Sequence, residues 1–246
     1  MTLNNLQHQG KISRNKTLIM GGCFIVLTML VAFLGLMQVE KQQRIKTLDS
    51  LQVMLTTTHD TVKNIWLKSL FSDMSVWASD PVSNEYVQTL LSAPREYSAL
   101  VNSKALHDLR EHFKKHLERQ DALGMFIIAP DYTNLASMRN ENLGKQNLIA
   151  KWRHTYLEKA FLGKQQLVPP LPSDVPLPDE HGKLVDNYPT MFILIPIQDK
   201  ERVIAVMAIR LNPFLTFSKI PQIARVGASG ESYLLDRQGH IIVASR

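Results

Sequence analysis

An uncharged apolar run constrains this chain more than any other feature of its sequence. The run covers residues 18–37 and reads LIMGGCFIVLTMLVAFLGLM. A helix needs about 20 predominantly apolar residues to cross the hydrocarbon core of a bilayer. We therefore predict a transmembrane helix over residues 17–37. A cleaved secretory signal is the alternative, but no small-x-small cleavage site follows Met37.

The charges beside the run bear on its orientation. Three basic residues precede it and three follow it: Lys11, Arg14, Lys16, Lys41, Arg44 and Lys46. A long domain is translocated largely regardless of its charges, whereas a short basic N-terminus without acids suits the cytoplasm. We expect the protein in the inner (plasma) membrane, with residues 1–16 in the cytoplasm. Residues from about 38 onward are then periplasmic or extracellular.

Composition narrows the class of the remaining chain. Of the 246 residues, 45% are hydrophobic and 20% are charged, which is enough apolar material for a core. The net charge is +6, but lysines and arginines are scattered among acids, so we expect no nucleic-acid partner. Cys23 is the only cysteine and lies in the apolar run. An intrachain disulfide and a Cys-rich zinc site are therefore excluded.

Motifs for catalysis are missing from the sequence. It contains no P-loop, zinc-protease helix or dinucleotide fingerprint, and residues 227–231 (GASGE) miss the G-x-S-x-G pattern by one position. We expect no catalytic residue and no cofactor, although an anchored extracytoplasmic enzyme is one alternative. His112 and His116 have the i, i+4 spacing of metal-binding pairs. Lys114 and Lys115 and the lack of a third ligand favour a solvated helix face instead, with no metal.

One long helix is expected to follow the membrane span. Residues 38–78 contain no proline or glycine, and their apolar side chains recur near helical spacing. Thr56, Thr57 and Thr58 have poor helix propensity, so packing must support that turn. Asp80 and Pro81 end the helix, which gives a stalk over residues 38–80. The helix either pairs with a second copy and transmits motion, or covers a sheet.

The rest of the chain combines helical and strand patterns. Helices are predicted over residues 83–91, 103–120 and 148–161, the last closed by Gly163. Strands are predicted over residues 125–129, 135–138, 190–198, 202–211, 231–236 and 240–245. The strands at 190–198 and 202–211 are almost wholly apolar, as in central strands covered on both faces. Five prolines in residues 167–179 predict an extended surface loop.

Three segments carry a resemblance to a known family. They read GMFIIAPDYTNLASMRNENLG from residue 124, PTMFILIPIQDKERVIAVMAIRLNP from residue 189 and RVGASGESYLLDRQGHIIVASR from residue 225. Together they resemble the extracytoplasmic double Cache region of bacterial transmembrane receptors, a relative of the PAS fold. The last segment is the most specific, because its glycines, acid and aromatic residue recur at fixed offsets.

The resemblance implies an α+β architecture in which helices flank a central antiparallel sheet. Residues 81–220 would form the membrane-distal module, and residues 221–246 the start of the membrane-proximal one. A hairpin at the chain's end lacks partner strands, so we expect the sequence to continue in a longer protein. Such receptors pair as homodimers and carry histidine kinase, diguanylate cyclase or chemotaxis outputs. A structural or partner-binding membrane protein is the alternative function.

Candidate ligand-binding residues follow from where Cache ligands sit, between the sheet and the helix and loop that cover it. Arg139 and Arg153 are expected to grip an anionic small molecule, because guanidinium forks bind carboxylates in a bidentate manner. Amino-acid-binding relatives carry an Arg-x-Trp-Tyr pattern, whereas residues 151–156 here read KWRHTY. The resemblance therefore does not imply an amino-acid ligand. Pairing of Arg139 with Glu141 is an alternative.

Four further side chains complete the candidate site. Trp152 and Tyr156 are expected to wall the pocket, Tyr132 to supply a hydroxyl group and Asp174 to meet an ammonium group. The alternative for Trp152 and Tyr156, which are four residues apart, is packing in the core.

Overall fold

The structure is a computed structural model that describes residues 3–60, 64, 66–179, 181–217, 233–235, 239 and 241–244. The chain divides into two compact units, Met1–Thr56 and Thr57–Arg246. The first consists of most of helix α1 (Leu3–Asp60), whose apolar part has a mean hydropathy of 2.3 and no buried residue in that window. This helix is long and apolar enough to span a membrane.

The described part of the predicted helix over residues 38–78 falls into two helices. Helix α1 ends at Asp60, and α2 (Leu67–Ala78) begins seven residues later, with Asn64 and Trp66 in π-helical turns. The division lies just after the threonine-rich turn, where β-branched residues support a helix least. Met74, Trp77 and Ala78 of α2 are buried against the sheet, so this part covers a sheet. Residues 61–63 and 65, which join the two helices, lie outside the described residues, so the single continuous helix stays a prediction.

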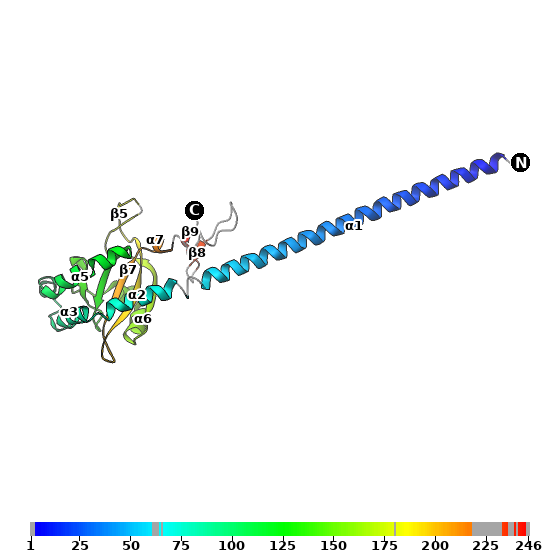
Figure 1. Cartoon of the computed structure of the whole chain (residues 1–246). Helices are drawn as coiled ribbons and strands as arrows, with labels where there is room; N and C mark the ends of the chain where they lie inside the picture. Colours follow the sequence, from blue (N-terminus) through cyan, green and yellow to red (C-terminus); the bar gives the residue numbers. More distant parts are fainter. Residues whose placement is uncertain are drawn as a thin grey trace. The chain divides into compact units, whose positions relative to one another are not determined.

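The second unit is built on a five-stranded antiparallel sheet (Figure 1). Its strands are β1 (Ala122–Ile128), β2 (Asn134–Ser137), β3 (Gln166–Pro172), β6 (Pro189–Asp199) and β7 (Arg202–Leu211). Their order across the sheet is β2-β1-β7-β6-β3. The hairpin of β1 and β2 is confirmed, and so is the interior position of β6 and β7. These two strands pair from Met191 with Leu211 to Asp199 with Arg202.

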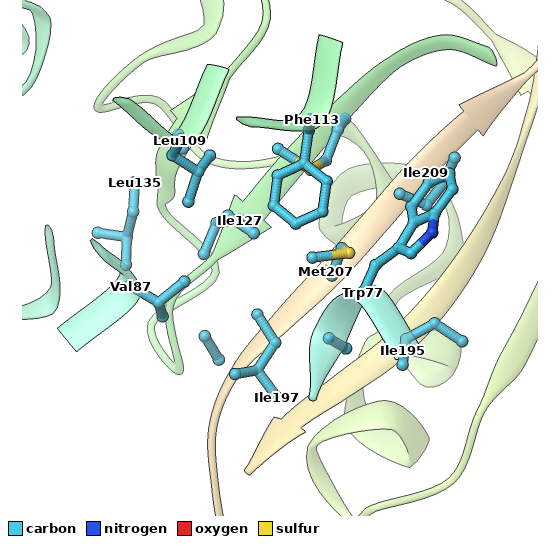
Figure 2. Close-up of a cluster of buried hydrophobic side chains, with 14 of the residues drawn as sticks. Trp77, Val87, Leu109, Phe113, Ile127, Leu135, Ile195, Ile197, Met207 and Ile209 are labelled. Atoms are coloured by element: carbon cyan, nitrogen blue, oxygen red, sulfur yellow. The ribbon is translucent and has the colours of Figure 1, made fainter. Parts of the chain in front are cut away.

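Alternate residues of each strand enter two separate hydrophobic clusters. Met125 and Ile127 belong to one cluster, whereas Phe126 and Ile128 belong to the other. The period of two puts successive side chains on opposite faces of the sheet. Helices α2, α3 (Pro81–Ser92) and α5 (Lys104–Arg119) cover the first face, where Trp77 and Phe113 pack near Ile209 (Figure 2). Helix α6 (Leu148–Phe161) covers the second face, which we call the α6 face.

The proline-rich segment was predicted wrongly as a surface loop. Its first half is the edge strand β3, in which Val168 and Leu171 are buried. An edge strand tolerates proline, because one side of the strand needs no N–H donor. The second half forms a short ribbon of β4 (Leu177–Pro178) and β5 (Leu184–Val185).

Short elements complete the fold. They are α4 (Tyr97–Val101), the 3-10 turn η2 (Asn140–Asn142), α7 (Pro213–Phe217), and the antiparallel pair β8 (Tyr233–Leu235) and β9 (Ile241–Ala244). The predicted C-terminal hairpin is thus confirmed within the described residues. Most of the glycine-containing motif that precedes it, residues 227–232, lies outside them.

Candidate functional site

A buried arginine marks the α6 face of the sheet. Arg210, on β7, is 2% exposed and stands opposite Phe192 of β6. Its guanidinium carbon lies 5.0 Å from the ring centre of Phe126 and 5.4 Å from that of Phe192. Aromatic faces attract a cation, but a buried charge still carries a penalty of several kcal/mol unless it is paired.

Asp174 supplies the partner of Arg210. Arg210 Nη2 donates to Asp174 Oδ1 at 2.5 Å. Burial lowers the pKa of Arg210, and the Asp174 carboxylate opposes that effect, while the neighbouring charge of Arg139 adds to it. Arg210 Nε is also buried and has no hydrogen-bond partner among the described residues. Among the described residues, Asp174 therefore pairs with Nη2 but not with the neighbouring donor Nε of the guanidinium.

Arg139 reaches the same segment as Asp174. Its Nη1 donates to the carbonyl oxygen of Pro176 at 3.0 Å, rather than pairing with Glu141 as the alternative had it. The structure thus brings together two predicted residues, Arg139 and Asp174, around a third that the sequence analysis missed. Asp174 meets a guanidinium of the protein itself here, whereas we had expected it to meet a ligand ammonium group.

Arg153 departs from helical geometry in the middle of α6. Its φ and ψ are −144° and 44°, so the helix is kinked there. The buried Arg153 Nε has no hydrogen-bond partner within the described part of the chain. Backbone outliers of this kind concentrate at functional sites.

The aromatic residues of the predicted site lie around α6. Trp152 is 49% exposed, with Lys151 Nζ 5.1 Å from its ring centre, so it belongs to no core. Tyr156 and Tyr132 are half-buried against the cluster under α6. The ring of Tyr132 meets that of His154 edge-on, with 4.9 Å between their centres.

A buried asparagine network positions the start of α6. Asn147 accepts the N–H of Ile149 through its side chain at 2.8 Å and so caps the helix. The amide nitrogen of Asn147 donates to Asn134 Oδ1 at 2.6 Å, and Asn134 donates to the carbonyl of Asn142 at 3.0 Å. The three asparagines are buried, so the beginning of the helix that carries Arg153 is firmly placed.

A second polar cluster lies on the opposite face of the sheet. His112 Nε2 is 2.6 Å from Asp80 Oδ2, and the ring of His116 lies 5.3 Å from that of Trp77. The two histidines are half-buried, which corrects the solvated face predicted for them. They line a surface groove of about 710 Å³ with Ser72, Ser75, Val76, Trp77, Ser79, Asp80, Pro81 and Phe113. Among the described residues, no group of three or more His, Cys, Asp or Glu side chains is arranged to hold a metal ion.

Burial opposes ionisation of Asp80, but hydrogen bonds from Ser83 and Val82 and the charge of His112 outweigh it and lower the pKa of Asp80. Asp80 also caps α3, because its side chain accepts the N–H of Val82. Every partner of this carboxylate belongs to the junction of α2, α3 and α5, so we assign it a structural role.

Comparison with known proteins finds solved structures that are similar to this fold. No protein-family model and no curated protein matches the sequence. The sensor domain of the V. cholerae histidine kinase DctB is similar in structure, with a TM-score of 0.52 and 14% identity over 83% of this chain and 69% of that one. The extracellular domain of vpHK1S-Z8, named as a histidine kinase, gives a TM-score of 0.51 and 15% identity over 79% and 66%.

A third structure is the sensory domain of the Campylobacter jejuni chemoreceptor Tlp3 with isoleucine bound. Its TM-score is 0.47, with 13% identity over 81% of this chain and 71% of that one. The structural neighbours are thus sensor domains of histidine kinases and chemoreceptors. This chain shares the fold of the DctB and vpHK1S-Z8 domains. It combines an antiparallel sheet with helices, and it also has a long apolar helix near its N-terminus.

Proposed function

We propose that this chain is the extracytoplasmic ligand-sensing region of a membrane-bound signalling receptor. The observation that carries the proposal is the structural similarity to the DctB sensor domain, in a chain that also has a helix able to span a membrane. In this proposal residues 81–220 form the distal module of a double Cache region and residues 221–246 begin the proximal one. The N-terminus is cytoplasmic, and the output domain is a kinase, cyclase or chemotaxis module outside this chain.

The ligand we propose is a small molecule with a carboxylate group, bound on the α6 face. Arg210 and Arg139 lie near one another, and among the described residues Asp174 is the one carboxylate that pairs with either of them, through Arg210. This surplus of positive charge favours an anion, and guanidinium groups match the planar geometry of a carboxylate. Arg153, with its unpartnered Nε among the described atoms, is a further donor, and Trp152, Tyr156 and Tyr132 would contact the rest of the ligand.

The sheet supplies a route from the site to the helices on the other face. Phe192 contacts Arg210 on the α6 face, while the next residue, Ile193, belongs to the cluster that α2 covers. A ligand that favours one arrangement of the α6 face would shift the packing of α2, because close-packed layers move together. In a homodimer, α1 would carry this shift to the membrane as a small displacement.

A thermal-shift screen tests the proposal. The full chain in detergent micelles is melted with amino acids, monocarboxylates, dicarboxylates, amines and purines. A ligand at about 100 times its Kd stabilises the folded state by about 2.7 kcal/mol, which is roughly 5–10 °C for a unit of this size. We expect carboxylates to raise the melting temperature and simple amines to leave it unchanged.

Two substitutions in the same strand locate the binding site. Arg210→Lys retains the positive charge but loses the planar guanidinium group, so it should abolish the rise in melting temperature caused by carboxylates. Arg202→Lys, at the exposed start of β7, should leave that rise unchanged. Arg153→Ala should also weaken the shift. A folded protein that no compound class stabilises would contradict a small-molecule sensor and would favour a structural or partner-binding role.

A further inference from the structure

The two arginines of the proposed site hold the same short piece of backbone. Residues 173–176, which we call the strap, join β3 to β4. Arg210 holds the strap through the Asp174 carboxylate, and Arg139 holds it through the carbonyl oxygen of Pro176. A ligand that takes these donors must therefore compete with the strap.

We propose that Asp174 is an internal carboxylate that occupies Arg210 until the carboxylate of a ligand displaces it, and that this exchange releases the strap. The inference rests on the proposed function, because it concerns the same site. It adds that the Asp174 carboxylate competes with the ligand for Arg210. This competition sets the affinity of the site for the ligand and couples ligand binding to a movement of the strap.

The geometry of Arg210 favours the exchange. Asp174 uses Nη2 of the guanidinium, while Nε on the same edge has no partner among the described residues. A free carboxylate that approaches this edge can accept from both nitrogens, whereas Asp174 accepts from one. The rings of Phe126 and Phe192 hold the guanidinium in place while its partner changes.

The exchange also avoids an unpaired buried charge. Arg210 is 2% exposed, so removal of Asp174 without replacement would leave a cation in an apolar layer. A ligand carboxylate keeps the charge paired at every stage, so the concentration of ligand decides which carboxylate occupies Arg210.

The strap can move without unfolding its neighbours. Before it, β3 pairs with β6 as far as Pro172, and after it Leu177 is fully buried. Inside it, Ser173 and Val175 bond mainly to one another, through Ser173 Oγ. One backbone bond, from the N–H of Ser173 to the carbonyl of Tyr188, ties the strap to the chain that follows β5.

The test uses acetate as the probe and Asp174→Asn as the variant. The substitution removes the competing charge and keeps the size of the side chain. With the full chain in detergent micelles, we expect the acetate concentration needed for a given thermal shift to fall at least tenfold. Sodium chloride at equal ionic strength should have no such effect. Asp186→Asn, an exposed aspartate after β5, is the matched control and should behave as the wild type.

Hydrogen exchange in the wild-type chain gives a second readout that needs no variant. Saturating acetate should speed exchange of the Ser173 and Val175 amides, and leave Phe192 in β6 unchanged. A structural ion pair alone would produce no such acceleration. This measurement tests whether acetate releases the strap even if Asp174→Asn does not fold.

The outcomes separate the two proposals. One outcome would refute only the proposed competition by Asp174. In that outcome acetate binds through Arg210, its affinity is equal in the wild type and Asp174→Asn, and the strap does not change. The proposed carboxylate site would then remain supported. If no carboxylate binds the wild type or the variant, both the competitor and the carboxylate site are refuted.

Discussion

Gly144, in the loop that leads to α6, offers a quantitative test of the packing that positions the site. Its φ is +71°, and a Cβ built on it would lie 2.5 Å from the backbone carbonyl oxygen of Arg95. The left-handed conformation costs a residue with a side chain roughly 1–2 kcal/mol. The close contact adds about 1–3 kcal/mol, because backbone cannot give way as a flexible side chain can. We expect Gly144→Ala to reduce the free energy of unfolding by roughly 2–5 kcal/mol.

Gly182 separates the two contributions. Its φ is +77°, but no heavy atom of the described residues, apart from Gly182 and its two chain neighbours, lies within 4 Å of a Cβ built there. Gly182→Ala should therefore show the conformational part alone, about 1–2 kcal/mol.

Urea unfolding of the full chain in micelles, followed by tryptophan fluorescence, to which buried Trp77 contributes, measures both variants. With an m-value of about 2 kcal/mol/M, Gly144→Ala should lower the midpoint by about 1–2.5 M and Gly182→Ala by about 0.5–1 M. Equal midpoints for the two variants would refute the close contact with Arg95. Because the Gly144 N–H also donates to the carbonyl of Asn134, the same loop carries the network that starts α6.

Three further predictions concern the core, the cap of α6 and the second polar cluster. Asn147→Ala removes the cap on Ile149 N–H and should destabilise the fold by about 2 kcal/mol in urea unfolding, whereas Asn147→Asp should recover part of this. Ile127→Ala empties a fully buried position and should cost about 2–5 kcal/mol, against about 1 kcal/mol for Ile127→Val. Burial and the charge of His112 lower the pKa of His116, so the unfolded chain binds that proton more readily. Stability should therefore fall as the pH drops below the ordinary histidine pKa of about 6.5 and level off below the folded pKa of His116. His116→Gln should remove this part of the pH dependence, and an unchanged profile would contradict the assignment.

The spacing of apolar residues along the chain was enough to predict the helices and strands that depend mainly on their own residues. The helical state of the apolar run, the bounds of α6, the β1–β2 hairpin and the two interior strands all follow from apolar spacing, and the structure agrees with the sequence on each. The reason is that the periods of helix and strand arise from local backbone geometry. Arg139 and Asp174 were singled out from their chemistry, and the structure brings both to the segment after β3, but their role in binding a ligand stays a prediction.

Non-local contacts decided the rest. Prolines at residues 169 and 170 became part of strand β3 because the segment lies at a sheet edge, a position that composition does not reveal. Arg210 was overlooked as the last charge in an apolar strand, although an arginine at a buried position of such a strand is a usable signal. Its importance depends on Asp174, 36 residues away, and on the two rings beneath it. Burial and charge pairing are properties of segments that meet only on folding, so the tertiary structure alone could place the buried arginine and its carboxylate.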